Sequence, residues 1–255
     1  MIAFLFKINP LFLRTVIMKG CDQMLFLMIL SLYGSIVGSF AGVCGMRIVQ
    51  KQSFYTGRSH CDKCQSVLKW YELIPLFSFL YLKGRCRTCQ QVIPKEIFVF
   101  ELFFASFTPF LWLTGNHHWR LLLFQFLLIG LLAVLAYIDI KIQLVPNQVH
   151  LWLMCLVLLN YQGIQTHIKG GLLIFVPLFI LSWVTAEGMG GGDVKLFGSL
   201  GFVLGWKAIL LIFSYAVFCS LPIAMYMKFY KGRDGVPFVP FITIGSCLFF
   251  LFNGR

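Results

Sequence analysis

Two aspartates stand out in this chain because acidic residues are rare and most of the sequence is apolar. Asp139 ends an apolar run and is followed by Lys141, while Asp193 comes directly after three glycines, where another apolar run begins. Only 9 of the 255 residues are Asp or Glu. An ionisable group that reaches the interior of a bilayer costs at least a few kcal/mol, so such residues are candidates for a functional site. Two carboxylates that approach each other can share one proton and activate water.

The two aspartates are expected at opposite ends of helices. Asp139 lies at the C-terminal end of a predicted helix, where the helix dipole disfavours a negative charge. Asp193 lies at the N-terminal end of another, where the dipole favours one. This asymmetry separates the proton affinities of a coupled pair. One carboxyl can then stay protonated and polarise a carbonyl group, while the ionised one takes a proton from water.

Gly190, Gly191 and Gly192 add a second signal next to Asp193. Consecutive glycines permit unusual backbone angles, and they leave room for an extended peptide substrate to approach closely. Taken alone, the segment around Asp139 and the glycine run could each have a purely structural role. Asp139 fits a solvated interfacial turn, and the glycines fit a flexible loop before a helix cap. A phosphate-binding loop is disfavoured because the Walker spacing is absent.

The elements that carry these residues are predicted to be membrane-spanning helices. The chain is 59% hydrophobic and 12% charged, with a mean hydropathy of +0.85, which excludes an ordinary soluble domain. A helix needs about 20 apolar residues to cross the hydrocarbon core, and the runs do not alternate as barrel strands do. The sequence therefore predicts an all-α polytopic membrane protein with about seven or eight spans. They cover about residues 24–46, 97–113, 121–138, 149–161, 172–185, 194–205, 206–227 and 236–252.

The charges of the loops orient these spans. The loop between the first two spans carries nine cations against Asp62 and Glu72, and the positive-inside rule places it in the cytoplasm. Counting spans from there brings both aspartates to the cytoplasmic face of the cell membrane. The formal net charge of +12 does not indicate nucleic acid as a partner, because the basic residues lie between apolar runs and form no single face.

The chain divides into three predicted parts. Residues 1–23 are an N-terminal extension to which we assign no function, since a signal peptide and a start at Met18 or Met24 both stay open. Residues 24–114 form an N-terminal domain with the first spans and the cysteine-bearing loop. Residues 115–255 form a second membrane domain that holds both aspartates.

Four of the nine cysteines lie in the cytoplasmic loop as two C-x-x-C pairs, Cys61 with Cys64 and Cys86 with Cys89. This spacing is typical of a structural site in which four thiolates bind Zn²⁺. Disulfides are disfavoured because the cytoplasm keeps thiols reduced. A redox-sensitive set of thiols stays open as the alternative. The remaining cysteines are interpreted as small apolar residues, and the histidines His117, His118, His150 and His167 as solvated residues at span ends.

The segment Gly190–Leu196, which reads GGGDVKL and includes Lys195, resembles the second active-site motif of the prepilin peptidases, the G-x-G-D membrane aspartic proteases. Residues 137–147 are similar to the first motif of this family. The resemblance implies that Asp139 and Asp193 are catalytic. It also implies cleavage of positively charged leaders from type IV prepilin or pseudopilin precursors at the cytoplasmic face, for a pilus, competence or secretion system.

The cysteine loop resembles the N-terminal region of the bacterial members, which commonly also methylate the new N-terminus with S-adenosylmethionine. The resemblance implies this cofactor and makes Glu72, Gly84, Arg85 and Glu101 candidate methyltransferase residues. The chain departs from the family pattern at two places. Residues 41–43 read Ala-Gly-Val where an Asn-Val pair is usual, and Tyr71 stands where Asn is usual.

Two other functions are compatible with a chain of this kind. A zinc-stabilised transporter would need polar residues deep within several spans, whereas both aspartates lie at span ends. An assembly scaffold would use the cysteine loop to dock proteins. The number of chains in the assembly is not encoded in any pattern that we recognise.

Overall fold

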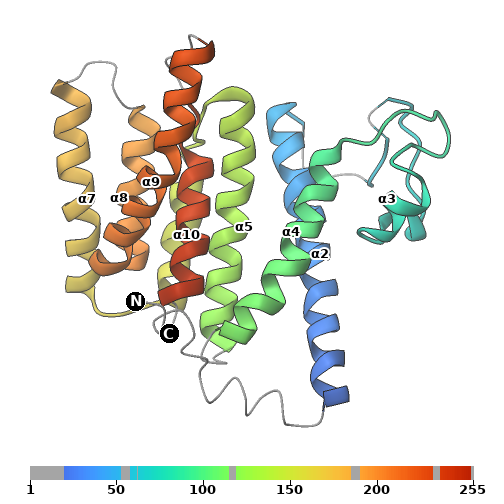
Figure 1. Cartoon of the computed structure of the whole chain (residues 1–255), viewed down its shortest axis with the longest axis horizontal. Coiled ribbons are helices and arrows are strands. Elements are labelled where there is room, and N and C mark those ends of the chain that lie inside the picture. The colour runs from blue at the N-terminus through green and yellow to red at the C-terminus, as the bar shows by residue number, and fades with distance from the viewer. Residues whose placement is uncertain are drawn as a thin grey trace. The chain divides into compact units, whose positions relative to one another are not determined.

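A computed structural model describes residues 20–52, 58–61, 63–114, 119–184, 190–231 and 236–253. The predicted N-terminal extension therefore lies almost wholly outside the described residues, as do His117 and His118. Helices make up nearly all of the described chain, and its only β-structure is two isolated bridges, His60 with Val67 and Arg85 with Val92. In chain order (Figure 1) the elements are α2 (Gly20–Val49), the 3₁₀-helix η1 (Trp70–Leu73), α3 (Phe77–Tyr81), α4 (Lys95–Thr114), α5 (Trp119–Ile142), α6 (Gln148–Leu156), the 3₁₀-helix η2 (Val157–Leu159), α7 (Ile164–Val184), α8 (Gly191–Leu204), α9 (Trp206–Lys231) and α10 (Val239–Asn253).

The prediction of an all-α polytopic membrane protein is confirmed. Among the described residues, five helices are long and apolar enough to cross a membrane: α2, α4, α5, α7 and α9. The apolar segments Gln148–Leu159 and Val239–Asn253 are shorter, and α8 has 14 residues. These eight segments correspond to the eight predicted spans. The largest difference is in α7, which begins at Ile164 rather than at residue 172, because its first two turns are polar and contain two glycines.

The chain forms two compact units. One unit comprises the described residues of 1–40 and 58–113, and the other those of 41–57 and 114–255. The boundary at residue 114 lies close to the predicted one, but the first boundary falls inside α2. Sequence periodicity cannot reveal such a boundary, because α2 is apolar and continuous through it.

In the first unit, glycines bring α2 close to α4. A Cβ at Gly38 would lie only 2.6 Å from the carbonyl oxygen of Phe100. Gly34, one turn earlier, faces the backbone of Phe104 in the same way. Small residues that let two backbones approach are the usual means of packing helices in a membrane, where water does not drive the association.

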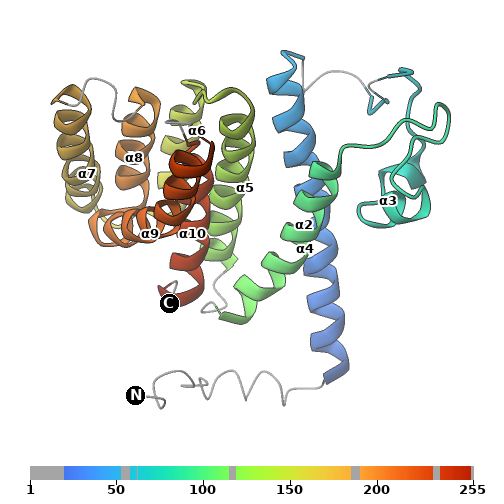
Figure 2. The same cartoon turned by 45° about the horizontal axis from the view of Figure 1, so that its top comes forward.

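In the second unit, α7 packs on α8, α10 packs on both α5 and α9, and the helices run side by side (Figures 1 and 2). Gly170 and Gly201 bring α7 and α8 into backbone contact, since a Cβ at either would meet the other's backbone. A hydroxyl ties α10 to α5, because Thr243 Oγ1 donates to the carbonyl of Leu132 over 3.1 Å. Tight packing on both sides leaves the centre of α5 buried.

Candidate active site and metal centre

Asp139 lies in the last turn of α5 and is almost fully buried, with 6% of its surface exposed. Its Oδ2 accepts a hydrogen bond of 3.0 Å from the backbone N–H of Val239, the first residue of α10. The first N–H groups of a helix have no partner within the helix, and an acceptor placed there satisfies one of them. Asp139 therefore sits at the C-terminal end of α5 and also at the N-terminal end of α10. Two helix dipoles of opposite sign act on one carboxyl.

Asp193 lies in the first turn of α8, before its apolar part, as the sequence predicts. Burial, followed by the negative charge of Asp139, raises the pKa of Asp193 to about 6. The second cause means that the two carboxyls lie within electrostatic reach of each other, although they are 54 positions apart (193 − 139) in the sequence. The helix-dipole argument predicted the opposite for Asp193, because the dipole of α8 alone would favour its charge. Burial outweighs that dipole.

The glycine run does not have the unusual backbone angles that three consecutive glycines permit. Gly190 is the N-cap of α8 with φ −61° and ψ 131°, and Gly191 and Gly192 belong to the first helical turn. None of the three has a positive φ, so the conformation does not require glycine. A Cβ at Gly191 would meet nothing within 4 Å, whereas one at Gly192 would lie 3.3 Å from Val145. The glycines thus leave open space beside Asp193 and let α8 approach the segment that follows α5.

A second polar group lies on the other side of α8. His150 Nδ1 is 2.8 Å from Ser199 Oγ, and Ser199 donates to the carbonyl of Lys195 over 2.9 Å. Because the hydroxyl hydrogen of Ser199 is used in that bond, Ser199 Oγ accepts a hydrogen bond from the Nδ1–H of His150. In this neutral tautomer the Nε2 of His150 carries no hydrogen and can only accept a hydrogen bond. Among the described residues, that Nε2 is the only buried side-chain nitrogen or oxygen without a partner. It borders a cavity of about 550 Å³ between α6, α7 and α8, to which Lys195 also contributes.

The interpretation of the histidines as solvated residues was wrong for His167. It is fully buried, its Nδ1 is 2.6 Å from the carbonyl oxygen of Phe202, and its Nε2 accepts from the N–H of Gln162. It joins the start of α7 to the end of α8. His150 is half-buried rather than solvated. The sequence contained no signal for either, because their partners lie 35 and 49 positions away.

The four loop cysteines form one cluster. Their sulfurs all lie within 4.8 Å of one another, with 3.7 Å between Cys61 and Cys89 and 4.0 Å between Cys64 and Cys86. All four are free thiols. Four sulfurs bound to one Zn²⁺ at about 2.3 Å in a tetrahedron lie about 3.8 Å apart, so the cluster fits this ion. The group can hold a metal.

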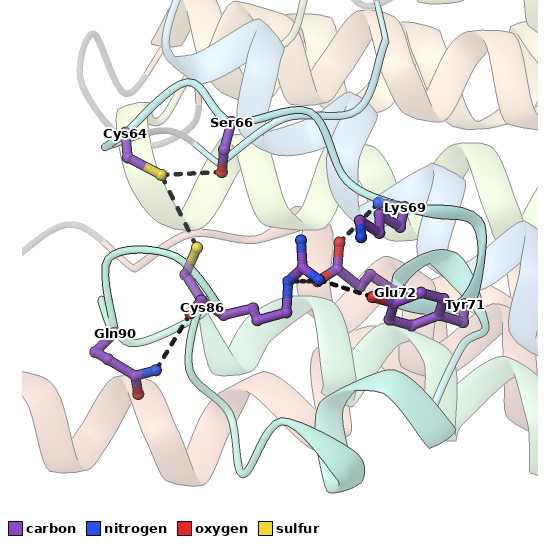
Figure 3. A network of polar contacts seen from close by, with 8 residues as sticks. Cys64, Ser66, Lys69, Tyr71, Glu72, Cys86 and Gln90 are labelled. Carbon is purple, nitrogen blue, oxygen red and sulfur yellow. Dashed lines mark hydrogen bonds and ion pairs between the residues drawn. The ribbon is translucent and has the colours of Figure 1, made fainter.

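Local hydrogen bonds favour the thiolate form of two of the four sulfurs. The backbone N–H groups of Cys89 and Thr88 lower the pKa of Cys86 to about 6. The side chain and backbone of Ser66 lower the pKa of Cys64, whose sulfur is 3.0 Å from Ser66 Oγ (Figure 3). A thiolate is the form that binds a metal. Cys86 and Cys64 are therefore predisposed to bind a metal. Despite a hydrogen bond from the backbone of Gln91, burial and the neighbouring cysteine side chains raise the pKa of Cys89 to about 11.

The candidate methyltransferase residues each have a separate structural partner. Glu72 is buried, forms an ion pair of 3.1 Å with Arg87, and accepts a 2.7 Å hydrogen bond from the backbone of Lys69 (Figure 3). Glu101 is buried in α4 and accepts a 2.7 Å hydrogen bond from the backbone N–H of Leu76. This bond holds Leu76 in an unusual conformation with φ 61°. These contacts give both acids a structural role in the packing of the loop.

Gly84 and Arg85 form the turn after α3. Gly84 has φ +68°, and a Cβ there would lie 3.0 Å from the ring of Phe79, so only glycine fits without strain. Arg85 is exposed and pairs with Val92 in an isolated bridge. The Gly-Arg pair therefore has a clear role in the fold of the loop.

Comparison with known proteins gives two family matches that cover most of the chain. The profile of the bacterial peptidase A24 N-terminal domain matches residues 32–114, and that of the type IV leader peptidase family matches residues 126–225. The prepilin leader peptidase/N-methyltransferase of Bacillus subtilis is 31% identical over 238 residues, which cover 89% of this chain and 94% of the relative. That of Vibrio cholerae is 30% identical over 213 residues, 75% of this chain and 82% of the relative. No solved structure gives a significant match.

Proposed function

The chain belongs to the type IV leader peptidase family, and we propose that it cleaves the leaders of prepilin-like precursors with Asp139 and Asp193 as its catalytic pair. One observation carries the assignment of the two residues: the first turn of α8, which holds Asp193, packs at Gly192 on Val145, just beyond the end of α5 that holds Asp139. The negative charge of Asp139 also contributes to the raised pKa of Asp193. Coupled carboxyls with separated proton affinities are the requirement for activating water without a metal.

The two carboxyls divide the work of hydrolysis. In the reactive form of the pair Asp193, whose pKa is raised to about 6, carries the proton and donates a hydrogen bond to the scissile carbonyl oxygen. Asp139, held by the N–H of Val239, is the ionised member and takes a proton from the attacking water. The water oxygen bonds to the carbonyl carbon, and the C–N bond breaks as the amine receives the proton that Asp139 took from water. The open space at Gly191 admits the extended peptide.

The catalytic pair faces the cytoplasm in this proposal. Seven cations lie between α2 and α4, with Arg47 and Lys95 at the adjoining helix ends, and they support that placement through the positive-inside rule. Asp139 ends α5 and Asp193 begins α8, so an even number of crossings separates each from that loop. Precursors would therefore be cut before they leave the cytoplasmic face.

Cys61, Cys64, Cys86 and Cys89 would hold a structural Zn²⁺. Their free thiols and mutual distances support this proposal. Four-sulfur sites have no open position for substrate, so the ion would stabilise the loop and take no part in hydrolysis.

The relatives are named for a second activity, N-methylation. Glu72, Gly84, Arg85 and Glu101 remain the candidates for this reaction, with S-adenosylmethionine as methyl donor. Because Glu72 and Glu101 are already engaged by Arg87 and by Leu76, their contribution would be to shape the loop.

Co-expression of the chain with a pilin-like precursor tests the proposal. Mass spectrometry of the precursor's N-terminus reports the cleavage site and any added methyl group. Asp139→Asn and Asp193→Asn should each lower cleavage by at least about 10³-fold, because groups that act as a unit fail together. The control Glu96→Gln, an acid of α4 outside the pair, should leave cleavage unchanged. Full processing of the precursor by either aspartate variant would show that the replaced aspartate is not catalytic.

A further inference from the structure

The loop between α2 and α4 exposes a cluster of large apolar side chains, which we call the aromatic patch: Trp70, Leu73, Phe77, Leu80 and Tyr81. Trp70 is 77% exposed, and Leu80 and Tyr81 are each 67% exposed. The rings of Phe77 and Tyr81 stack on each other with centroids 5.9 Å apart, so they form one continuous surface. Neither the cysteine cluster nor the catalytic pair uses these residues.

The patch is held beside α4, not beyond its end. Leu76, next to the patch, donates its N–H to Glu101 in the second turn of α4. Phe79 stacks on Phe98 of the first turn with centroids 4.6 Å apart. Figures 1 and 2 both show α3 alongside the N-terminal half of α4. With a rise of 1.5 Å per residue, Glu101 lies about 9 Å along the helix from Lys95.

The contacts that hold the patch lie near the polar end of a candidate membrane span. Helix α4 is one of the membrane-spanning candidates, and its first turn carries Lys95 and Glu96, which mark the polar end of the span. Amphipathic segments that lie in the interface bury their apolar face about 5–10 Å below the headgroup boundary. Trp and Tyr are the residues enriched at that level. Phe98 and Glu101, which hold the patch, lie about 4.5 and 9 Å along α4 from Lys95, a distance comparable to this range.

Among the described residues of segment 69–87, which contains the patch, the exposed charges are cationic: Lys69, Lys83, Arg85 and Arg87. Its acid Glu72 is buried and paired with Arg87. Basic side chains next to an inserted apolar face attract anionic headgroups. We propose that the aromatic patch inserts into the headgroup region of the bilayer and that its basic rim binds anionic phospholipids, so that the cysteine loop rests on the membrane surface.

A fluorescent probe in the full-length protein tests this proposal. A genetically encoded, environment-sensitive amino acid is placed at Leu80, and in a second variant at Tyr81, and the protein is reconstituted in nanodiscs of phosphatidylcholine with phosphatidylglycerol. The control position is Ser59, an exposed residue of the same loop outside the patch. Lipids spin-labelled near the headgroup should quench the probes at Leu80 and Tyr81 severalfold more than the probe at Ser59.

Two results would overturn the proposal. Equal quenching at Leu80 and Ser59 would mean that the patch does not contact lipid. Burial of the Leu80 probe only on addition of a precursor peptide or at high protein density would mean that the patch binds protein instead. Quenching at Leu80 should also weaken when phosphatidylglycerol is omitted or when the salt concentration is raised. Quenching that does not change under either condition would rule out recognition of anionic headgroups.

Discussion

The cysteine cluster and the aspartate pair are built in opposite ways. Each C-x-x-C turn arranges its own sulfurs through hydrogen bonds within a few residues, as Cys86 does with the N–H of Thr88 and Cys89. Asp139 is instead held by Val239, which is 100 positions away. A site made of local turns can be read from spacing, whereas a site made of distant helix ends depends on the packing of every helix between them.

The largest expected effect tests the local site. Cys86→Ser should reduce bound zinc from about one ion per chain to none, because apparent binding free energies of structural sites, about 10 kcal/mol or more, need the complete ligand set. Metal analysis of the purified protein gives the readout. Cys155→Ser, at an exposed lone cysteine of α6, should keep its zinc. A Cys86→Ser protein with undiminished zinc would show that the cluster is not the binding site.

The second prediction tests whether the loop between α2 and α4 also depends on a contact from outside it, the hydrogen bond between Leu76 and Glu101 of α4. Glu101→Leu should destabilise the loop by about 1–3 kcal/mol, because it leaves the buried N–H of Leu76 without its acceptor. Hydrogen exchange of residues 74–83 should then accelerate. Glu101→Gln, which keeps an acceptor oxygen, should accelerate it less. Unchanged hydrogen exchange in both variants would mean that the bond to Glu101 does not stabilise the loop.

A smaller effect concerns the coupling of the aspartates. Carbodiimides react with the protonated carboxylic acid, so labelling of Asp193 should disappear as the pH rises through about 6. Asp139→Asn removes the negative charge that contributes to the raised pKa, and the labelling should then disappear at a lower pH. Peptide mapping by mass spectrometry measures the midpoint. An identical midpoint in the variant would mean that the two carboxyls are independent.

The smallest effect concerns Gly191. Gly191→Ala should change the free energy of unfolding by less than about 1 kcal/mol, because the added methyl group meets open space and alanine is the better helix former. The same methyl group should obstruct the peptide and raise KM for the precursor. Thermal unfolding and cleavage kinetics separate the two effects. If KM were unchanged, the glycine run would serve only the close packing of Gly192 on Val145.

The sequence was sufficient to predict the features that depend on composition or on the spacing of nearby residues. The apolar runs gave the spans, and the four cysteines gave a cluster whose sulfurs do converge. It was insufficient where a long-range contact decides. The dipole of α8 suggested a favoured charge on Asp193, but burial raises its pKa. His167 was misjudged because its hydrogen-bond partner Phe202 lies on another helix.

The hydrogen bond between Val239 and Asp139 has a consequence for the timing of assembly. A ribosome that adds about 5–20 residues per second needs about 5–20 seconds to make the 100 residues that separate donor from acceptor. During that interval Asp139 has been synthesised but its helix-end donor has not. The surroundings of Asp139 are therefore completed late in synthesis, when α10 enters the bundle, and a ribosome that stalls earlier leaves Asp139 without this donor.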